Sequence, residues 1–221
     1  MNQETIAFLQ KLSKNNNRPW FQSHKAEFDI IYSNFKELAE WVKTELEKSD
    51  HIESVNVFRI YRDIRFSTDK TPYKTNLSAG YKRATKRLRG GYYFEVDCDG
   101  TAFVGGGFWS PSPEDVKRIR DEFAADSKSI LKITSQKSFK TYFGELQGDG
   151  LKNAPRGYDS GLPLIELIKK KQYVIRRLFT KEEVLHKGFE KEIVKTCIAM
   201  RRFFDYMSSV LTTDINGEEI I

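Results

Sequence analysis

The sequence contains little cysteine or histidine and no long apolar run. Its 221 residues include two cysteines and three histidines. Cys98 and Cys197 lie far apart, without CxxC spacing or a neighbouring histidine pair, which predicts two buried thiols rather than a disulfide or a zinc site. No apolar stretch approaches the roughly 18 residues of a membrane-spanning helix, and the first residues lack the pattern of a secretory signal. We therefore expect a cytoplasmic protein without a membrane span, metal or cofactor.

Positive charge is abundant but concentrated in one segment. Residues 59–89 contain ten lysines and arginines against Asp63 and Asp69, a net charge of +8, whereas the whole chain carries +6. The rest of the chain is therefore slightly acidic, at −2. An acidic partner is expected to bind this segment.

Helical patterns lie towards both ends of the chain. Apolar residues recur at helical spacing from Ser23 to Lys48. They recur again in one long stretch after Thr180, where Glu183 stands in capping-box position. Shorter helices are expected over residues 3–13, 127–142 and 164–170, and after the N-cap Ser112.

Strand patterns occupy the middle of the sequence. Apolar and polar residues alternate over residues 57–66, and Arg62 falls on the same face as Phe58, Ile60, Ile64 and Phe66. Its guanidinium there would need an acidic or carbonyl partner, or a bulge that turns it outward. Further strands are expected over residues 77–83, 92–98, 101–106 and 173–179, with a tight primed turn at Asp99-Gly100.

Helices before and after a block of strands predict the fold class. We expect one α+β domain over residues 1–221, in which long N-terminal and C-terminal helices flank an antiparallel sheet of about five strands.

The segment from Phe58 to Thr75, FRIYRDIRFSTDKTPYKT, is long and unusual in composition. Together with residues 16–21, 90–94, 105–109, 155–159 and 163–167, it resembles the family called domain of unknown function 2461. The resemblance covers nearly the whole chain. It implies a shared fold and a shared site, but it brings no activity with it.

The basic segment carries donors that suit an anion. Arginine presents a planar fork to carboxylate or phosphate, and lysine adds a mobile charge. Asp63 is the candidate acid or base, because neighbouring arginines would hold it ionised. The alternative is that Asp63, Asp69 and other carboxylates pair the cations into a structural network. The candidate ligand-binding residues are Arg59, Tyr61, Arg62, Arg65, Lys70, Tyr73, Lys74, Arg156 and Tyr158.

Two glycine-containing segments offer further candidates. The loop Arg156-Gly157-Tyr158-Asp159 combines a cation, a phenol and a carboxylate beside a flexible glycine. We predict that it folds over the basic strand and that Arg156 completes a site with Arg59, Arg62 and Lys74; the alternative is an Arg156–Asp159 pair that only holds the loop. The triplet Gly105-Gly106-Gly107 indicates either a phosphate cradle or close packing of the backbone.

Three functions fit these patterns. The first is a binding or catalytic pocket for a small phosphorylated or carboxylated ligand. The second is nucleic-acid binding, favoured by the basic run from Lys82 to Arg89. The third is a structural or interaction module without catalysis, which predicts that the basic residues are paired internally.

Overall fold

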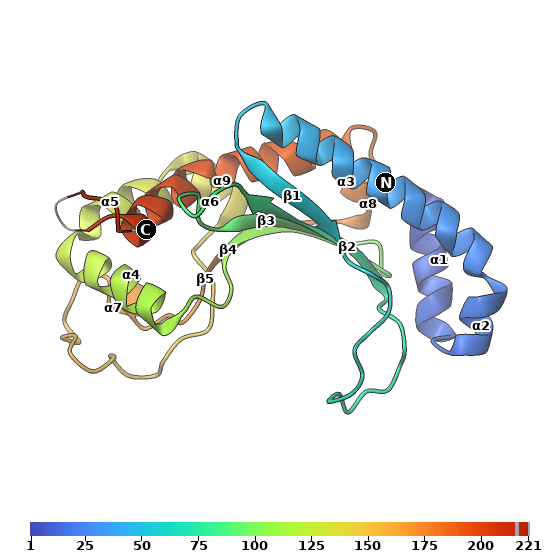
Figure 1. Ribbon diagram of the computed structural model, residues 1–221, viewed down its shortest axis with the longest axis horizontal. Coiled ribbons are helices and arrows are strands. Elements are labelled where there is room, and N and C mark those ends of the chain that lie inside the picture. Colours follow the sequence, from blue (N-terminus) through green and yellow to red (C-terminus); the bar gives the residue numbers. More distant parts are fainter. Residues whose placement is uncertain (215–216, 221) are drawn as a thin grey trace. The chain divides into compact units, whose positions relative to one another are not determined.

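The computed structural model describes residues 1–214 and 217–220 (Figure 1). Helices stand before and after a five-stranded antiparallel sheet, which confirms the α+β class. None of the described helices is long and apolar enough to cross a bilayer. The elements are α1 Gln3–Lys14, α2 Arg18–Ser23, α3 Lys25–Glu47, β1 Ile52–Val57, β2 Asn76–Arg83, β3 Gly91–Asp97, β4 Ala102–Phe108, α4 Pro113–Ala125, α5 Ser127–Thr134, α6 Lys137–Phe143, α7 Ile165–Ile168, β5 Tyr173–Phe179, α8 Lys181–Leu185 and α9 Phe189–Thr212.

The sheet is a meander in which sequence neighbours are also sheet neighbours, in the order β1-β2-β3-β4-β5. Burial alternates along β3, so that every second side chain points into the core. Phe94 is fully buried, and its ring lies 5.6 Å from Phe35 of α3 and 6.1 Å from Phe189 of α9. This face of β3 is therefore covered by helices. Tyr93 and Glu95 point to the opposite face.

The chain divides into two compact units built from interleaved segments. The unit boundaries fall within β2, β3, β4, β5 and α9, so neither unit is a continuous stretch of sequence. The single domain over residues 1–221 stays a prediction. The first unit comprises Met1–Tyr81, Tyr93–Val104 and Leu178–Lys195, and the second comprises Lys82–Tyr92, Gly105–Arg177 and Thr196–Ile221.

The predicted strand over residues 57–66 is wrong. β1 ends at Val57, and residues 58–75, called the arm below, leave the sheet as an irregular hairpin (Figure 1). Side chains near its tip bind the local backbone instead: Asp69 Oδ1 accepts from the Thr71 N–H at 2.9 Å. Such bonds compete with a strand ladder. The apolar alternation consequently faces no core at its end, where Phe66 is 96% exposed.

Two further local predictions need correction. The Thr180–Glu183 capping box is confirmed, but the expected single helix is interrupted between Leu185 and Phe189, where Gly188 has a φ of 96°. A second correction concerns the β3–β4 hairpin. The Asp97 N–H donates to the Thr101 carbonyl at 2.9 Å, and the three residues between them have a positive φ at Gly100 alone, which is typical of a type I turn followed by a bulge rather than a primed turn.

The predictions for the other four strands are confirmed, and the prediction for the cysteines is confirmed in part. β2, β3, β4 and β5 begin and end within two residues of their predicted limits, which confirms these four strands. Both cysteines are free, and Cys197 is buried as predicted, but the prediction of a buried thiol is wrong for Cys98, which is half-buried because it lies in the β3–β4 hairpin.

Candidate functional site

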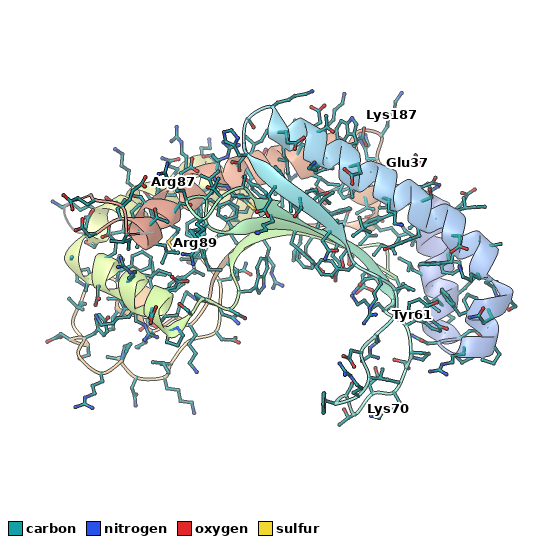
Figure 2. The ribbon with its side chains drawn as sticks, viewed as in Figure 1. Glu37, Tyr61, Lys70, Arg87, Arg89 and Lys187 are labelled. Atoms are coloured by element: carbon teal, nitrogen blue, oxygen red, sulfur yellow. The ribbon has the colours of Figure 1, made fainter. Side chains whose placement is uncertain are left out.

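The root of the arm is fixed to the segment that joins α1 and α2. The side chain of Asn16 donates to the Tyr73 carbonyl at 2.9 Å and accepts from the Tyr73 N–H at 3.1 Å. Phe21 of α2 stacks on the Tyr73 ring at 4.1 Å, and Tyr61 meets Phe21 edge-on at 6.0 Å. Two of the predicted ligand residues, Tyr61 and Tyr73, therefore hold the arm in place. Figure 2 shows Tyr61 near this root and Lys70 at the tip.

The guanidinium of Arg62 is already bound within the arm. It donates to the carboxylate of Asp69 and to the hydroxyl of Thr71, and it reaches the Thr71 carbonyl at 3.3 Å. The Arg62 guanidinium therefore has the acidic and carbonyl partners that were predicted for it from the sequence. The Thr71 N–H and the Arg62 guanidinium together lower the pKa of Asp69 to about 2.

A second acid–base pair lies nearby in the arm. Arg65 donates to both oxygens of Asp63, at 3.0 Å and 2.6 Å. These bonds lower the pKa of Asp63, which makes this carboxylate a weak proton acceptor. Lys70 donates to the Ile64 carbonyl at 2.9 Å. The tip of the arm therefore fits the internally paired network that was the alternative to an anion site.

Three arginines of the following basic run are paired as well. All three partners belong to the second unit. Arg83 is almost completely buried, so its ion pair satisfies a charge that could not otherwise be buried. The pairs are Arg83–Asp205 at 2.6 Å, Arg87–Glu219 at 2.6 Å and Arg89–Asp115 at 2.5 Å.

Arg59 and Lys74 are the two predicted cations of the first unit whose side chains form no hydrogen bond or ion pair with residues 1–214 and 217–220. Arg59 is exposed. Lys74 is half-buried, and its ammonium lies 5.2 Å from the centre of the Phe58 ring.

The other two predicted ligand residues, Arg156 and Tyr158, line an open hollow in the second unit. The hollow has a volume of about 530 Å³ and is called the Arg156 hollow below. α4 supplies one wall, and the loop before α7 supplies the other. The lining residues are Lys117, Arg120, Asp121, Leu151, Pro155, Arg156, Gly157 and Tyr158.

A tight turn places Arg156 at the rim. The Tyr158 N–H donates to the Pro155 carbonyl at 3.2 Å, and Gly157 between them has a φ of 92°. A positive φ at the third position is typical of a type II turn and favours glycine. Pro155 is buried, so it anchors the turn while Arg156 at its corner remains exposed.

Arg156 keeps its donors open. Asp159, the expected partner in the alternative reading, instead accepts from the Gly161 N–H at 2.6 Å. Across the described ranges 1–214 and 217–220, the guanidinium of Arg156 forms neither an ion pair nor a hydrogen bond. The loop is therefore held by its own turns rather than by an Arg156–Asp159 pair.

The opposite wall contains a fixed carboxylate. Asp121 accepts from the Tyr158 hydroxyl at 2.7 Å and from the Lys117 ammonium at 2.6 Å. Burial acts to raise the pKa of Asp121, but these two donors outweigh it and leave the pKa below its usual value. Burial and the bond to Asp121 raise the pKa of Tyr158 to about 12.

Arg120 belongs to the wall of the hollow that α4 supplies. Its guanidinium donates to the carbonyls of Ile168 at 2.7 Å and Lys170 at 3.1 Å, which joins α4 to the end of α7. Arg120 also bonds to the Tyr173 hydroxyl. An arginine has five N–H donors, so these three bonds still leave others for a ligand. The lining contains three cations, Lys117, Arg120 and Arg156, and one carboxylate, Asp121, so its net charge is +2.

The sequence profile of the family described as "Conserved hypothetical protein (DUF2461)" matches residues 4–206. The chain belongs to this family. The match includes both the arm and the loop with Arg156, which confirms the resemblance seen in the sequence. No curated protein matches the chain.

The predicted composite site stays a prediction. Arg59, Arg62 and Lys74 belong to the first unit of this DUF2461 member, and Arg156 belongs to the second. Within the second unit, the wall that faces Arg156 was not predicted from the sequence. Helical spacing could have revealed it, because Lys117, Arg120 and Asp121 lie three and four residues apart and so share one face of α4.

The glycine triplet in β4 is explained by close packing. A Cβ added to Gly106 would lie 2.5 Å from the Phe204 ring and 2.7 Å from the Gly91 carbonyl oxygen. A Cβ on Gly107 would lie 2.3 Å from the Tyr173 carbonyl oxygen. Both positions lack room for any side chain, which confirms the packing interpretation of these two glycines.

Proposed function

We propose that this protein binds a small phosphorylated or carboxylated ligand in the Arg156 hollow. The proposal rests on Arg156, which is exposed and whose guanidinium has no partner among the described residues. Lys117 and Arg120 add two further cations to the same lining. A planar fork with open donors binds carboxylate and phosphate through two parallel hydrogen bonds.

The charge and size of the hollow agree with such a ligand. Its lining has a net charge of +2, and the single carboxylate, Asp121, already accepts bonds from Lys117 and Tyr158. An incoming anion therefore meets a surplus of cations. The volume of about 530 Å³ lies in the range of roughly 300–1,000 Å³ that is usual for small-molecule sites.

Tyr158 has a positioning role in this proposal. Its hydroxyl is protonated at neutral pH, as in any tyrosine, and the rise of its pKa to about 12 extends this to alkaline pH, so it donates to Asp121. The bond fixes the phenol ring against α4 and sets the position of the neighbouring turn. Leu151 and Pro155 add apolar surface for the uncharged part of a ligand.

The test is a binding panel measured by calorimetry with orthophosphate, sugar phosphates, nucleoside monophosphates and dicarboxylic acids. Arg156→Ala should weaken the best binder about tenfold to a hundredfold, the usual worth of hydrogen bonds to a charged group. Arg156→Lys should lie between, because lysine keeps the charge but loses the fork.

Arg202→Ala is the matched control. Arg202 is an exposed arginine of α9 that donates to Gln136 at 3.1 Å and does not line the hollow. Its replacement should leave binding unchanged. Equal losses in the Arg156 and Arg202 variants, or the absence of any millimolar binder in the panel, would contradict the proposal.

A further inference from the structure

A second candidate site lies in the first unit, on the face of β3 that points away from α3. Tyr93 and Glu95 share this face because they are two residues apart in a strand. The hydroxyl of Tyr93 donates to Glu95 Oε2. The Tyr93 ring lies 5.4 Å from the ring of Phe103 and 5.9 Å from that of Phe58, so two aromatic side chains pack near the donor of this bond.

The other oxygen of Glu95 is left open. Oε1 accepts no hydrogen bond from any residue in the described part of the chain, although Glu95 is half-buried. Burial raises the pKa of Glu95, and Asp97 adds to this effect, whereas the bond from Tyr93 and the charge of Lys74 oppose it. Glu95 Oε1 is not among the buried side-chain atoms that lack a partner, so it is open to solvent and a donor group of a ligand can reach it.

Glu95 also lines a hollow of about 530 Å³, called the Glu95 hollow below. The hollow runs from β3 and β4 to the segment that joins β5 to α8. It combines three carboxylates and one lysine with apolar surface, including Leu178, whose side chain is 67% exposed. The lining residues are Glu95, Asp97, Thr101, Ala102, Phe103, Leu178, Phe179, Thr180, Lys181 and Glu182.

The net charge of this lining is −2, opposite in sign to that of the Arg156 hollow. An anion is therefore disfavoured here. A metal ion is disfavoured as well, because the described residues hold no group of three or more His, Cys, Asp or Glu side chains placed to bind one. A cation that also carries an apolar body satisfies both the open carboxylate oxygen and the exposed apolar wall.

We infer that the Glu95 hollow binds a small organic cation, with its ammonium group at Glu95 and its apolar body against Phe103 and Leu178. The inference is independent of the proposed anion site, since it concerns another unit and another sign of charge. In the bound state, the ammonium donates to Glu95 Oε1 while Tyr93 continues to hold Oε2.

The test uses three probes that share a phenyl ring and differ in charge: 2-phenylethylamine, 2-phenylethanol and 3-phenylpropanoate. Binding is followed through the amide signals of Glu95, Phe103 and Leu178 by NMR titration of the full chain. The amine should bind saturably in the millimolar range or tighter, and the alcohol and the acid should each bind at least tenfold more weakly. Equal binding of the acid, or no saturable shift with the amine, overturns the inference.

Two variants separate the charge from the apolar wall. Glu95→Gln keeps the shape of the side chain and should weaken the amine at least tenfold. Leu178→Ser alters an exposed side chain, so the fold should persist while amine binding weakens severalfold. Glu37→Gln, which replaces an exposed glutamate of α3 (Figure 2), is the control and should change nothing. Unchanged amine binding in both Glu95→Gln and Leu178→Ser also overturns the inference.

Discussion

At the residue scale, Arg62 and Arg156 show how differently one chain uses the same side chain. Arg62 lies in the most basic segment, yet its donors are taken by Asp69 and Thr71. Arg156 lies in a loop with little charge around it in sequence, yet its donors remain open at the rim of a hollow. Local charge density therefore does not reveal which cation is available to a ligand. Availability depends on which carboxylates the fold brings close.

The Arg62–Asp69 pair leads to a prediction about titration. Asp69 should titrate near pH 2 in the folded protein, as followed by the carboxyl ¹³C shift. Because this pKa lies below the usual 3.8, the bonds from the Thr71 N–H and from Arg62 to Asp69 stabilise the fold at neutral pH, and that contribution is lost as the pH falls from about 4 to 2. Arg62→Ala should return the midpoint only part of the way, since the Thr71 N–H continues to bind the carboxylate.

Asp99 provides the internal reference for this titration. Its pKa is lowered by Thr101, in the β3–β4 hairpin and away from Arg62, so it should not respond to Arg62→Ala. A midpoint for Asp69 near 3.8 in the wild-type protein would show that neither the bond from the Thr71 N–H nor the pair with Arg62 persists in solution.

At the scale of elements, the sequence predicted those helices and strands whose apolar residues recur at a regular spacing or whose ends are capped. α3, β3 and the capped start of α8 repeat their apolar residues or carry caps that act over a few neighbouring residues. The arm was predicted as a strand because its residues alternate correctly. An alternating segment forms a strand only if it pairs with a neighbouring strand and its apolar side chains pack on a core. At the tip of the arm, side chain–backbone hydrogen bonds compete with such pairing. Helical spacing places Lys117, Arg120 and Asp121 on one face of α4, but it does not show that this face lies opposite the loop that carries Arg156.

The attachment of the arm gives a prediction at this scale. Asn16→Ala removes both bonds to the backbone of Tyr73 and leaves a buried N–H and carbonyl without this partner. Stability should fall by about 1–3 kcal/mol, the usual cost of unsatisfied buried groups. Hydrogen exchange should quicken at Tyr73 and along the arm, as measured by mass spectrometry. Asn34→Ala, at an exposed position of α3, should leave exchange in the arm unchanged. Equal exchange in both variants would show that Asn16 does not hold the arm.

At the scale of the whole molecule, the two compact units are interleaved along the chain. Each unit is assembled from three separate segments, and five elements begin in one unit and end in the other. A strand or helix forms cooperatively along its length, because each hydrogen bond helps to fix the next residue. Neither unit can therefore complete its elements without residues assigned to the other. This continuity of elements is the physical basis for expecting a single folding unit.

The tryptophans allow this expectation to be measured. Trp41 lies in the first unit and Trp109 in the second. A variant with Trp20→Phe and Trp109→Phe reports on the first unit, and one with Trp20→Phe and Trp41→Phe reports on the second. Trp41 and Trp109 are 37% and 40% exposed, so replacing either of them should disturb the fold little, and Trp20→Phe is common to both variants. If all five shared elements unfold together, urea denaturation followed by fluorescence should give coincident midpoints and slopes for the two variants, as a two-state transition requires. Midpoints that differ by about 1 M or more, after correction for the stability of each variant by circular dichroism, would show that the units unfold separately and that the chain is not one domain.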